Sequence, residues 1–312
     1  MYDIIGDIHG HADELVELLS QLGYREDRDS FRHPHRKVVF CGDFIDRGPQ
    51  IPEAVRIARS MVLHDAALAV MGNHEFNALA YHTEDPENPG QFLRPHDAHN
   101  QRQHASTVNQ FQRSDLQHAL NWFQTLPVAL DLGNLRIVHA CWSPADLQSI
   151  NAALVEFGGM TDEFLKSAMT RNSDLFNSVE CVLKGPELAL PTGVTVTDKE
   201  GNVRKRVRIR WFDSPVQRSW SEYALPSKND LPPSYVPKMA AAVPYTADQP
   251  PVFFGHYWLP DDQPCPLKHN VACLDYSIAK GGFLTAYRFD GEQILLPEKF
   301  VTVPSRSRGA VE

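Results

Sequence analysis

The sequence predicts an α/β fold, in which short buried strands alternate with helices. Three times in the first part of the 312-residue chain, a short apolar run ends at a glycine, a turn rich in Asp, Asn or His follows, and residues with helical apolar spacing come next. Open α/β sheets carry their chemistry at the carboxyl ends of their strands. These three turns are therefore the first candidates for a functional site.

Composition limits the classes of function that the chain can have. The hydrophobic and charged fractions, 42% and 22%, are ordinary for one large domain or a domain with an insertion. A net charge of −9 argues against a stable complex with nucleic acid or acidic membranes. No apolar run could span a bilayer and no basic-then-apolar leader begins the chain, so we expect a cytoplasmic protein without membrane contact. The five cysteines include no close CxxC pair, which predicts free thiols.

The first unit begins with a strand over residues 2–5 and continues into the turn Gly6-Asp7-Ile8-His9-Gly10. Alanine and leucine at helical spacing over residues 12–22 come next, and Gly23 stops this helix. Because Asp7 and His9 are two residues apart in an extended segment, their side chains point the same way and can bind one ion.

The second unit has a strand over residues 38–41 and the turn Gly42-Asp43-Phe44-Ile45-Asp46-Arg47-Gly48, which delivers two carboxylates and an arginine. Ile51-Pro52 then opens a helix. The third unit has a strand over residues 66–71 and the turn Gly72-Asn73-His74-Glu75 before a helical stretch. One such turn is weak evidence for a site, but three of the same kind are difficult to explain by packing alone.

Residues 83–112 are polar, rich in Asn, Gln and His, and predict a surface excursion that is partly helical. The histidines of this region do not follow strands, so we expect solvated or structural roles for His82, His96, His99 and His104. A helix over residues 115–125 is expected to follow.

The rest of the core supplies two further histidines. Gly133-Asn134 between two apolar runs predicts a β-hairpin whose second strand ends at His139. Helical spacing follows over residues 149–172. A strand over residues 252–254 then ends in Gly255-His256, and residues 272–275 and 283–287 are expected to be closing strands.

Residues 184–251 contain many prolines and predict an inserted β-hairpin followed by a Pro-rich loop. Arg204, Arg206, Arg208 and Arg210 alternate with apolar residues, so one face of the second hairpin strand carries arginine. One interpretation is a solvated edge strand whose charges prevent aggregation. The other is a face that overlooks the cleft and helps to bind an anionic substrate.

Six strand-end side chains make up the candidate metal site: Asp7, His9, Asp43, Asn73, His139 and His256. Imidazole and carboxylate ligands suit Mn, Fe, Zn or Co better than Mg alone. Six ligands are too many for one catalytic ion, but they suit two ions that share a carboxylate. Each residue alone has an ordinary explanation, such as a helix cap or a core histidine, but the set at successive strand ends does not.

Five motifs, in their order along the chain, resemble those of the calcineurin-like metallophosphoesterases, in the branch with phosphoprotein phosphatases and symmetrical diadenosine tetraphosphatases. They are the turns at 6–10, 42–48 and 72–75, together with Val138-His139-Ala140 and Phe254-Gly255-His256. The resemblance implies one domain over residues 1–312, an αββα sandwich of two mixed sheets flanked by helices. The insertion at 184–251 would lie near the cleft. The implied reaction is in-line attack on a phosphate ester by a hydroxide that bridges two metal ions.

The resemblance also assigns roles to single residues. Asp7, His9 and Asp43 would hold the first ion, and Asp43 would bridge to a second ion held by Asn73, His139 and His256. His74 would be the general acid, oriented by Asp46, and Arg47 would bind phosphate oxygens. Manganese is the expected metal, with Fe, Zn, Co or Ni as alternatives.

The chain departs from the family pattern next to three of the motifs. Met71 stands where eukaryotic-type protein phosphatases usually carry a phosphate-binding arginine, which weakens that assignment. Arg206, Arg208 and Lys184 are candidates to replace it.

Bulky aromatic residues follow the candidate ligands His139 and His256, at Trp142, Tyr257 and Trp258. We consider Tyr257 a candidate for contact with an aromatic substrate group, and buried packing as the alternative.

The expected activity is hydrolysis of a small phosphomonoester or a nucleotide. The alternatives are a diadenosine polyphosphate hydrolase and a Ser/Thr protein phosphatase. In the second case the partner would be a phosphoprotein. A scaffold that has lost its activity is a remote alternative, because such proteins usually lose ligands and none is missing here. The oligomeric state is left open by the sequence.

Overall fold

The computed structural model describes residues 1–197, 201, 203–227, 231–232, 234, 236 and 244–306. One of its two main sheets has six strands. They are, in order, β14 (Asp275–Tyr276), β15 (Phe283–Phe289), β1 (Tyr2–Ile5), β4 (Lys37–Phe40) and β5 (Ala67–Ala69), with β16 (Phe300–Pro304) beside β15. Strands β1, β4 and β5 run parallel, and β15 is antiparallel to β1.

The second main sheet has four strands and faces the first. Its order is β13 (Val271–Cys273), β12 (Val252–Phe254), β7 (Arg136–Val138) and β6 (Ala129–Asp131). The predicted hairpin at Gly133-Asn134 joins β6 to β7, and β7, β12 and β13 are parallel. One apolar cluster between the sheets combines Ile4 and Val39 with Ile137 and Phe253, so the two sheets pack face to face.

Alternation along the strands directs neighbouring side chains to different layers. In β4, Val39 joins the cluster between the sheets, whereas Val38 and Phe40 join the larger cluster under the helices. In β12, Phe253 and Phe254 divide in the same way. The predicted αββα sandwich of two mixed sheets flanked by helices is therefore confirmed.

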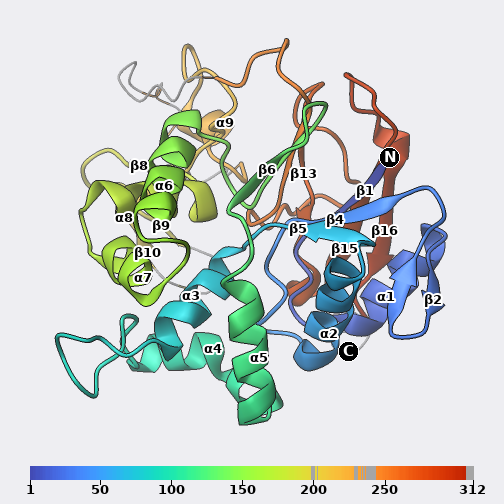
Figure 1. Ribbon diagram of the computed structural model, residues 1–312. Coiled ribbons are helices and arrows are strands. Elements are labelled where there is room, and N and C mark those ends of the chain that lie inside the picture. The colour runs from blue at the N-terminus through green and yellow to red at the C-terminus, as the bar shows by residue number, and fades with distance from the viewer. Residues whose placement is uncertain are drawn as a thin grey trace.

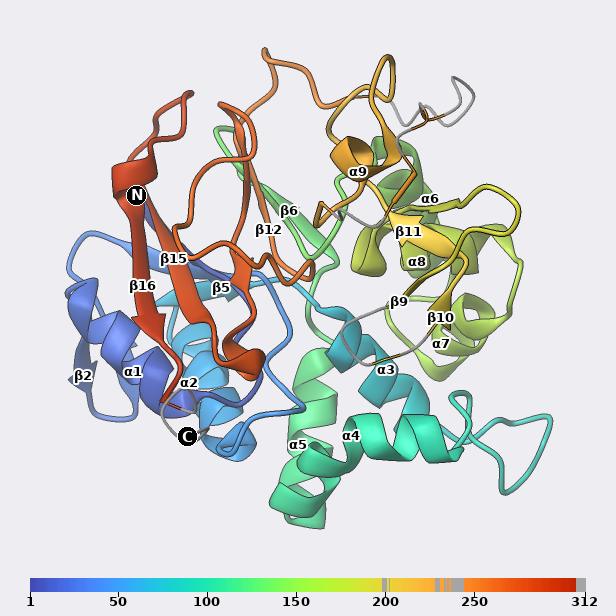
Figure 2. The same cartoon turned by 180° about the vertical axis from the view of Figure 1, so that it is seen from behind.

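Helices lie on both sides of the paired sheets (Figure 1). Helix α1 packs on β15 and β16, and α2 packs on β5. Helices α6, α7 and α8 group together beside the four-stranded sheet, and α4 lies near α3 and α5 (Figures 1 and 2). Their bounds are α1 (Ala12–Gln21), α2 (Ile51–Leu63), α3 (Asn73–His82), α4 (Ala98–Gln110), α5 (Arg113–Phe123), α6 (Pro144–Glu156), α7 (Asp162–Met169) and α8 (Asp174–Lys184).

The helices of the structure differ from the predicted helices in two places. The stretch at 149–172 is not one helix, because Gly158 and Gly159 adopt φ values of 74° and 122° that end α6 before α7 begins. Helix α8 was not predicted, although Ser173 caps its first turn and its buried residues Val179, Val182 and Leu183 follow helical spacing.

The segment predicted as an insertion, residues 184–251, contains short strands and a small apolar cluster. The predicted hairpin appears as β9 (Val196–Thr197) and β10 (Val203–Arg204), while most of its turn lies outside the described residues. Its second arm then changes partner at Lys205, and β11 (Arg206–Arg208) pairs with β8 (Glu187–Ala189). These strands and α9 (Trp220–Tyr223) lie beside α6–α8, away from α1 and α2 (Figures 1 and 2).

Smaller elements complete the chain: β2 (Arg25–Asp27), β3 (Ser30–Arg32), η2 (Ile278–Lys280) and η3 (Pro297–Lys299). All five cysteines are free thiols, as predicted. Within the described ranges, none of the helices is both long and apolar enough to cross a membrane.

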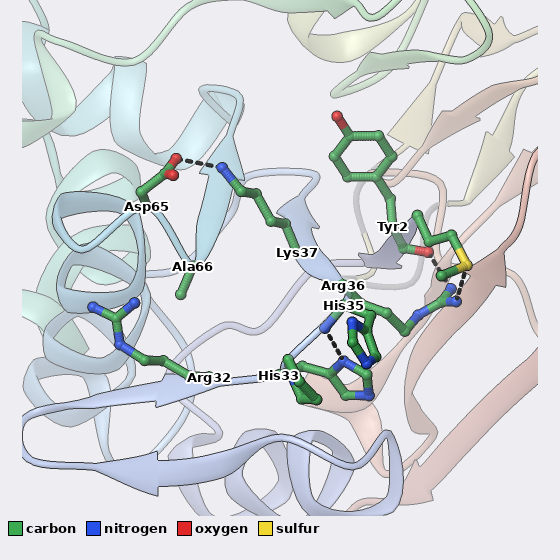
Figure 3. A pocket seen from close by; sticks show the side chains of 10 residues that line it. Tyr2, Arg32, His33, His35, Arg36, Lys37, Asp65 and Ala66 are labelled. Atoms are coloured by element: carbon green, nitrogen blue, oxygen red, sulfur yellow. Dashed lines mark hydrogen bonds and ion pairs between the residues drawn. The ribbon is translucent and has the colours of Figure 1, made fainter.

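A pocket of about 550 Å³ lies at the amino ends of β1 and β4 (Figure 3). Basic side chains line it, but several of them already have protein partners. Lys37 pairs with Asp65 across the pocket wall, and Arg36 turns away to donate to the carbonyl oxygens of Tyr2 and Phe289. This pocket is at the opposite ends of the strands from the turns that carry the candidate ligands.

Candidate active site

The turns after β1, β4 and β5 meet the ends of β7 and β12 at one edge of the sandwich. Backbone hydrogen bonds join them: the amides of Ile8 and His9 donate to Asp43 O, and Gly255 N donates to His139 O. Segments that are far apart in the sequence are thus fixed side by side. The structure brings together all five motifs that the sequence analysis identified.

Asp43 lies at the centre of two groups of potential metal ligands. His9 and His74 form one group with it, and His139 and His256 form the other. The ligand atoms of each group lie within 4.8 Å of one another, and all of these residues are buried. His9 Nε2 is 3.6 Å from Asp43 Oδ2, and His139 Nε2 is 3.4 Å from Asp43 Oδ1. A carboxylate with different histidines beside its two oxygens has the arrangement of a bridging ligand.

Asp7 and Asn73 adjoin this centre. Asn73 Oδ1 is 3.0 Å from His139 Nε2 and 2.7 Å from His256 Nδ1, so it points into the second group. Asp7 Oδ2 accepts a hydrogen bond from His256 N at 2.9 Å. A Cβ atom at Gly255 would collide with Asp7 Oδ1, so only glycine allows this approach.

Several buried atoms of the site make no hydrogen bond to any described residue. They are Asp7 Oδ1, His9 Nε2 and His256 Nε2. Buried polar atoms are normally satisfied. Buried carboxylate oxygens and imidazole nitrogens that make no hydrogen bond are the types of donor found in first-row divalent metal sites. The residues present therefore fit metal ions.

Backbone carbonyl groups orient two of the candidate histidine ligands. His9 Nδ1 lies 2.8 Å from Ile45 O, and His139 Nδ1 lies 2.7 Å from Cys41 O. When these Nδ1 atoms carry the protons, the Nε2 atoms face Asp43 with free lone pairs. Hydrogen bonds of this kind fix the orientation of metal-ligating histidines.

The backbone of the site is strained. Asp43, Asp46, Arg47 and His256 have φ values of 52°, 65°, 70° and 71°, and His9 has 46°. Left-handed conformations of residues other than glycine cost free energy and cluster at functional sites. These residues direct their side chains into the centre at the expense of local backbone stability.

Glu75, on the first turn of α3, holds the turn at 42–45 in place. Its carboxylate accepts hydrogen bonds from the amides of Asp43 and Phe44 at 2.8 Å, and from Gly72 N at 3.0 Å. Burial, together with the charge of Asp43, raises the pKa of Glu75 to about 7. Glu75 is thus a positioning residue for Asp43, a role that the sequence analysis did not assign.

The two candidate carboxylate ligands have opposite electrostatic environments. Burial, reinforced by the neighbouring Asp275 carboxylate, raises the pKa of Asp7 well above its usual value. For Asp43, burial acts in the same direction, but His139 and His74 outweigh it and hold the pKa well below its usual value. His139 opposes this rise for Asp7, but burial and the neighbouring carboxylates outweigh it.

His74 and Asp46 form a buried hydrogen-bonded pair. His74 Nδ1 lies 2.5 Å from Asp46 Oδ2, while His74 Nε2 faces the centre, 3.9 Å from Asp43 Oδ2. Burial would lower the pKa of His74, but the carboxylates of Asp43 and Asp46 raise it. The predicted orientation of His74 by Asp46 matches this geometry.

Arg47 belongs to the same turn, and its positive charge disfavours protonation of both His9 and His74, although the carboxylates of Asp43 and Asp46 raise the pKa of His74 overall. Its guanidinium lies over the ring of Trp258, 4.3 Å from the ring centroid. This contact is a cation–π interaction, which orients the planar group. Trp258 is thus a second residue of the site to which the sequence analysis gave no definite role.

The residues proposed for substrate binding do not all face the centre. Arg208 is half-buried and donates a hydrogen bond to Lys184 O at 2.9 Å. Burial lowers the pKa of His256 most, and the charge of Arg208 lowers it further. Arg206 is exposed and turns to Glu187. The ammonium of Lys184 pairs with Glu180 on its own helix.

Tyr257 is 2% exposed, and its ring packs against Phe254. Its hydroxyl lies against Gly185. Buried packing, the alternative given for this residue, matches the structure and speaks against contact with a substrate.

The histidines of the polar excursion also differ from one another. His99 is exposed, and His96 stacks on Tyr81 with 3.9 Å between ring centroids. His104, however, is 2% exposed and lies 2.8 Å from Asp46 Oδ1. Of the two roles expected for these histidines, solvated or structural, burial leaves the structural one for His104, because helix α4 brings this distant polar segment back to the site.

Comparison with known proteins identifies the family. The model of the calcineurin-like phosphoesterase family matches residues 2–189, well over half of the chain. The protein therefore belongs to this family, and the family predicted from the sequence is confirmed.

Two relatives illustrate how far the similarity extends. A symmetrical bis(5'-nucleosyl)-tetraphosphatase from Actinobacillus succinogenes is 25% identical over 299 residues, 93% of this chain and 94% of the relative. An asymmetrical bis(5'-nucleosyl)-tetraphosphatase PrpE from Halalkalibacterium halodurans is 49% identical over 74 residues, 23% of this chain and only 30% of the relative. The second similarity is thus stronger but confined to less than a third of that protein.

Among solved structures, a cold-active protein-tyrosine phosphatase from a Shewanella species aligns with 96% of this chain and 79% of its own. The sequence identity is 16% and the TM-score is 0.49. A likeness at this level says nothing about the substrate of this chain.

Proposed function

We propose that the protein is a two-metal phosphatase in which Asp43 bridges the ions. Asp7 and His9 would complete the first site, and the second would be held by Asn73, His139 and His256. The observation that supports this assignment is the pair of histidine groups on the two oxygens of one buried carboxylate. Ions at these sites would polarise the phosphoryl oxygens and supply a nucleophile from water at neutral pH. Manganese is our first choice of metal.

The protein's own side chains would do the remaining work. Arg47, held by Trp258, would bind two phosphoryl oxygens through its planar guanidinium. Asp46 would hold the Nδ1 proton of His74, so that His74 Nε2–H faces the centre and can protonate the leaving oxygen. Without this proton the departing group would leave as an unstable alkoxide.

The test is metal-dependent phosphate release. Protein dialysed extensively against a chelator should release no phosphate from 4-nitrophenyl phosphate, and readdition of Mn²⁺ should restore turnover. Mg²⁺ alone should restore less, because imidazole ligands suit Mn²⁺ better. Failure of every divalent ion to restore turnover would contradict the proposal.

Our first choice of substrate is a small phosphomonoester or nucleotide. A dinucleoside polyphosphate is the second candidate, because the symmetrical tetraphosphatase relative aligns with nearly the whole of both chains. Chromatography of the products separates these possibilities: symmetrical cleavage of diadenosine tetraphosphate yields only nucleoside diphosphate. Phosphopeptides in the same screen test the protein phosphatase alternative.

A cytoplasmic location and the extent of the insertion at 184–251 stay predictions from the sequence.

Arg208 is our candidate for the phosphate contact that Met71 does not supply. Arg206 provides a matched control, since it lies two residues away on the same strand but points to Glu187. Arg208→Ala should raise KM for diadenosine tetraphosphate about tenfold, the value of one charge-assisted hydrogen bond. Its effect on 4-nitrophenyl phosphate should be smaller, and Arg206→Ala should change either KM less. Equal effects of the two substitutions would favour the solvated edge strand instead.

A further inference from the structure

Helix α4 has an unusual buried face. Only His104 and Thr107 of its 13 residues are buried, and both are polar. Helices in globular proteins are usually held by a stripe of apolar side chains. Polar side chains therefore attach α4 to the rest of the protein.

Both buried side chains of α4 reach Asp46. His104 Nδ1 lies 2.8 Å from Asp46 Oδ1, and Thr107 Oγ1 donates to the same oxygen at 2.5 Å. Thr107 Oγ1 also accepts a hydrogen bond from Asp46 N at 3.0 Å. Because His104 and Thr107 occupy Oδ1, the other carboxylate oxygen remains for His74 Nδ1.

A third polar residue extends the contact along the same face of α4. Gln110 donates to Gly48 O at 2.8 Å and accepts from Ile51 N at 2.9 Å. The spacing of three residues from His104 to Thr107 to Gln110 places them on one side of the helix. Both of these hydrogen bonds join Gln110 to backbone atoms, whereas His104 and Thr107 bind the carboxylate of Asp46.

The ring of His104 is fixed from behind as well. Its Nε2 lies 3.1 Å from His82 Nε2, and its centroid is 5.1 Å from that of Tyr81. Burial and the neighbouring His104 lower the pKa of His82 to about 4, so His82 is neutral at neutral pH. A ring with contacts on both edges presents its Nδ1 to Asp46 in one orientation.

Resting on the proposed role of His74 as general acid, we infer that His104 and Thr107 are positioning residues for the protonation of the leaving group. They fix the plane of the Asp46 carboxylate, and Asp46 in turn fixes the ring of His74. Without them the carboxylate can rotate, and His74 Nε2 no longer points steadily at the departing oxygen. General acids lose efficiency when their alignment is lost.

The dependence of the rate on the leaving group tests this inference. A poor leaving group such as phenolate needs protonation, whereas 4-nitrophenolate leaves well without it. His104→Ala should lower kcat for phenyl phosphate about 30-fold, a part of the ~10²–10⁴-fold that general acids contribute. The loss for 4-nitrophenyl phosphate should be about threefold or less, and KM should change little for either ester.

Conservative variants separate the hydrogen bond from the fold. His104→Asn places an amide N–H near the position of Nδ1 and should recover most of the lost rate on phenyl phosphate. Thr107→Val keeps the shape but removes the hydroxyl, and should again impair phenyl phosphate more; Thr107→Ser should not. Gln110→Ala weakens the docking of α4 alone, so any loss that it causes should be equal for the two esters.

The outcomes distinguish this inference from the parent proposal. If His74→Asn affects phenyl phosphate selectively but neither His104→Ala nor Thr107→Val does, the positioning role is wrong and the general acid stands. If His74→Asn affects both esters equally, the general acid assignment itself fails. Circular dichroism shows whether the His104 and Thr107 variants are folded. If folded variants lose equal activity on both esters, α4 has only a structural role.

Discussion

The two ends of strand β1 each carry a buried aspartate, but only one of them is neutralised by the protein. Asp3, 0% exposed, accepts hydrogen bonds from Tyr24 at 3.0 Å and Arg36 at 2.8 Å. Arg288 lies 3.4 Å from its other oxygen. Asp7, 2% exposed, accepts one backbone hydrogen bond. The Oδ1 atom of neither aspartate has a hydrogen bond to the described residues, but only that of Asp3 faces an arginine.

This difference separates a structural charge from a functional one. A buried carboxylate needs compensation, and arginines supply it at the amino end of the strand. At the carboxyl end the neighbouring groups are further carboxylates and imidazoles, and the compensation by His139 does not outweigh burial and the carboxylates. The basic pocket beside Tyr2 and the candidate metal site thus lie at opposite ends of the sheet.

The largest expected effect concerns the carboxylate between the two histidine groups. Asp43→Asn keeps the size of the side chain but removes the charge that both ions would share. We expect kcat/KM for 4-nitrophenyl phosphate to fall by about 10³-fold or more, because metal ions contribute several kcal/mol to the transition state. Turnover near that of the wild type would contradict the bridging role.

The next effect concerns stability instead of activity. Asp3→Asn leaves the buried Arg36 with a weaker set of partners, so the free energy of unfolding should fall by about 3 kcal/mol. Urea denaturation measures this loss, and kcat of the folded fraction should be unchanged.

The matched substitution at the other end of β1 should act in the opposite way. Asp7→Asn removes a carboxylate whose ionised form is disfavoured by burial and by neighbouring carboxylates in the metal-free protein, so the metal-free form should be as stable as the wild type or more so. Its activity should nevertheless be strongly reduced. Similar destabilisation by the two substitutions would remove the distinction between the two aspartates.

The last effect is the stabilisation by metal. Ions that bind only the folded state at 100 times their Kd add about 2.7 kcal/mol per site. Adding Mn²⁺ to chelator-treated protein should therefore raise Tm of the wild type and of Asp3→Asn by similar amounts. Asp43→Asn should respond much less, and an equal response would place the ions elsewhere.

The parallel strands and their turns could be predicted because local sequence determines them. Gly6, Gly42 and Gly72 end short apolar runs, and each turn carries its ligands within a few residues. The sheets then bring these turns together, as a parallel topology requires. The ligand set was accessible from the sequence for this reason.

The supporting contacts could not be predicted, since they depend on long-range geometry. Glu75 and His104 reach the turn at 42–48 from helices that follow it in the sequence. For Glu75 a signal exists, because it stands three residues after Gly72, at the capping-box position of α3. For His104 the polar sequence of α4 concealed that its few buried residues face the site.

The most direct test of the central claim is the number of metal ions bound per chain. Protein reconstituted with Mn²⁺, freed of excess metal and measured by mass spectrometry of the elements should contain about two ions per chain. Asp43→Asn prepared in the same way should contain fewer than one, since both sites use that carboxylate. Two ions retained in Asp43→Asn would contradict the account.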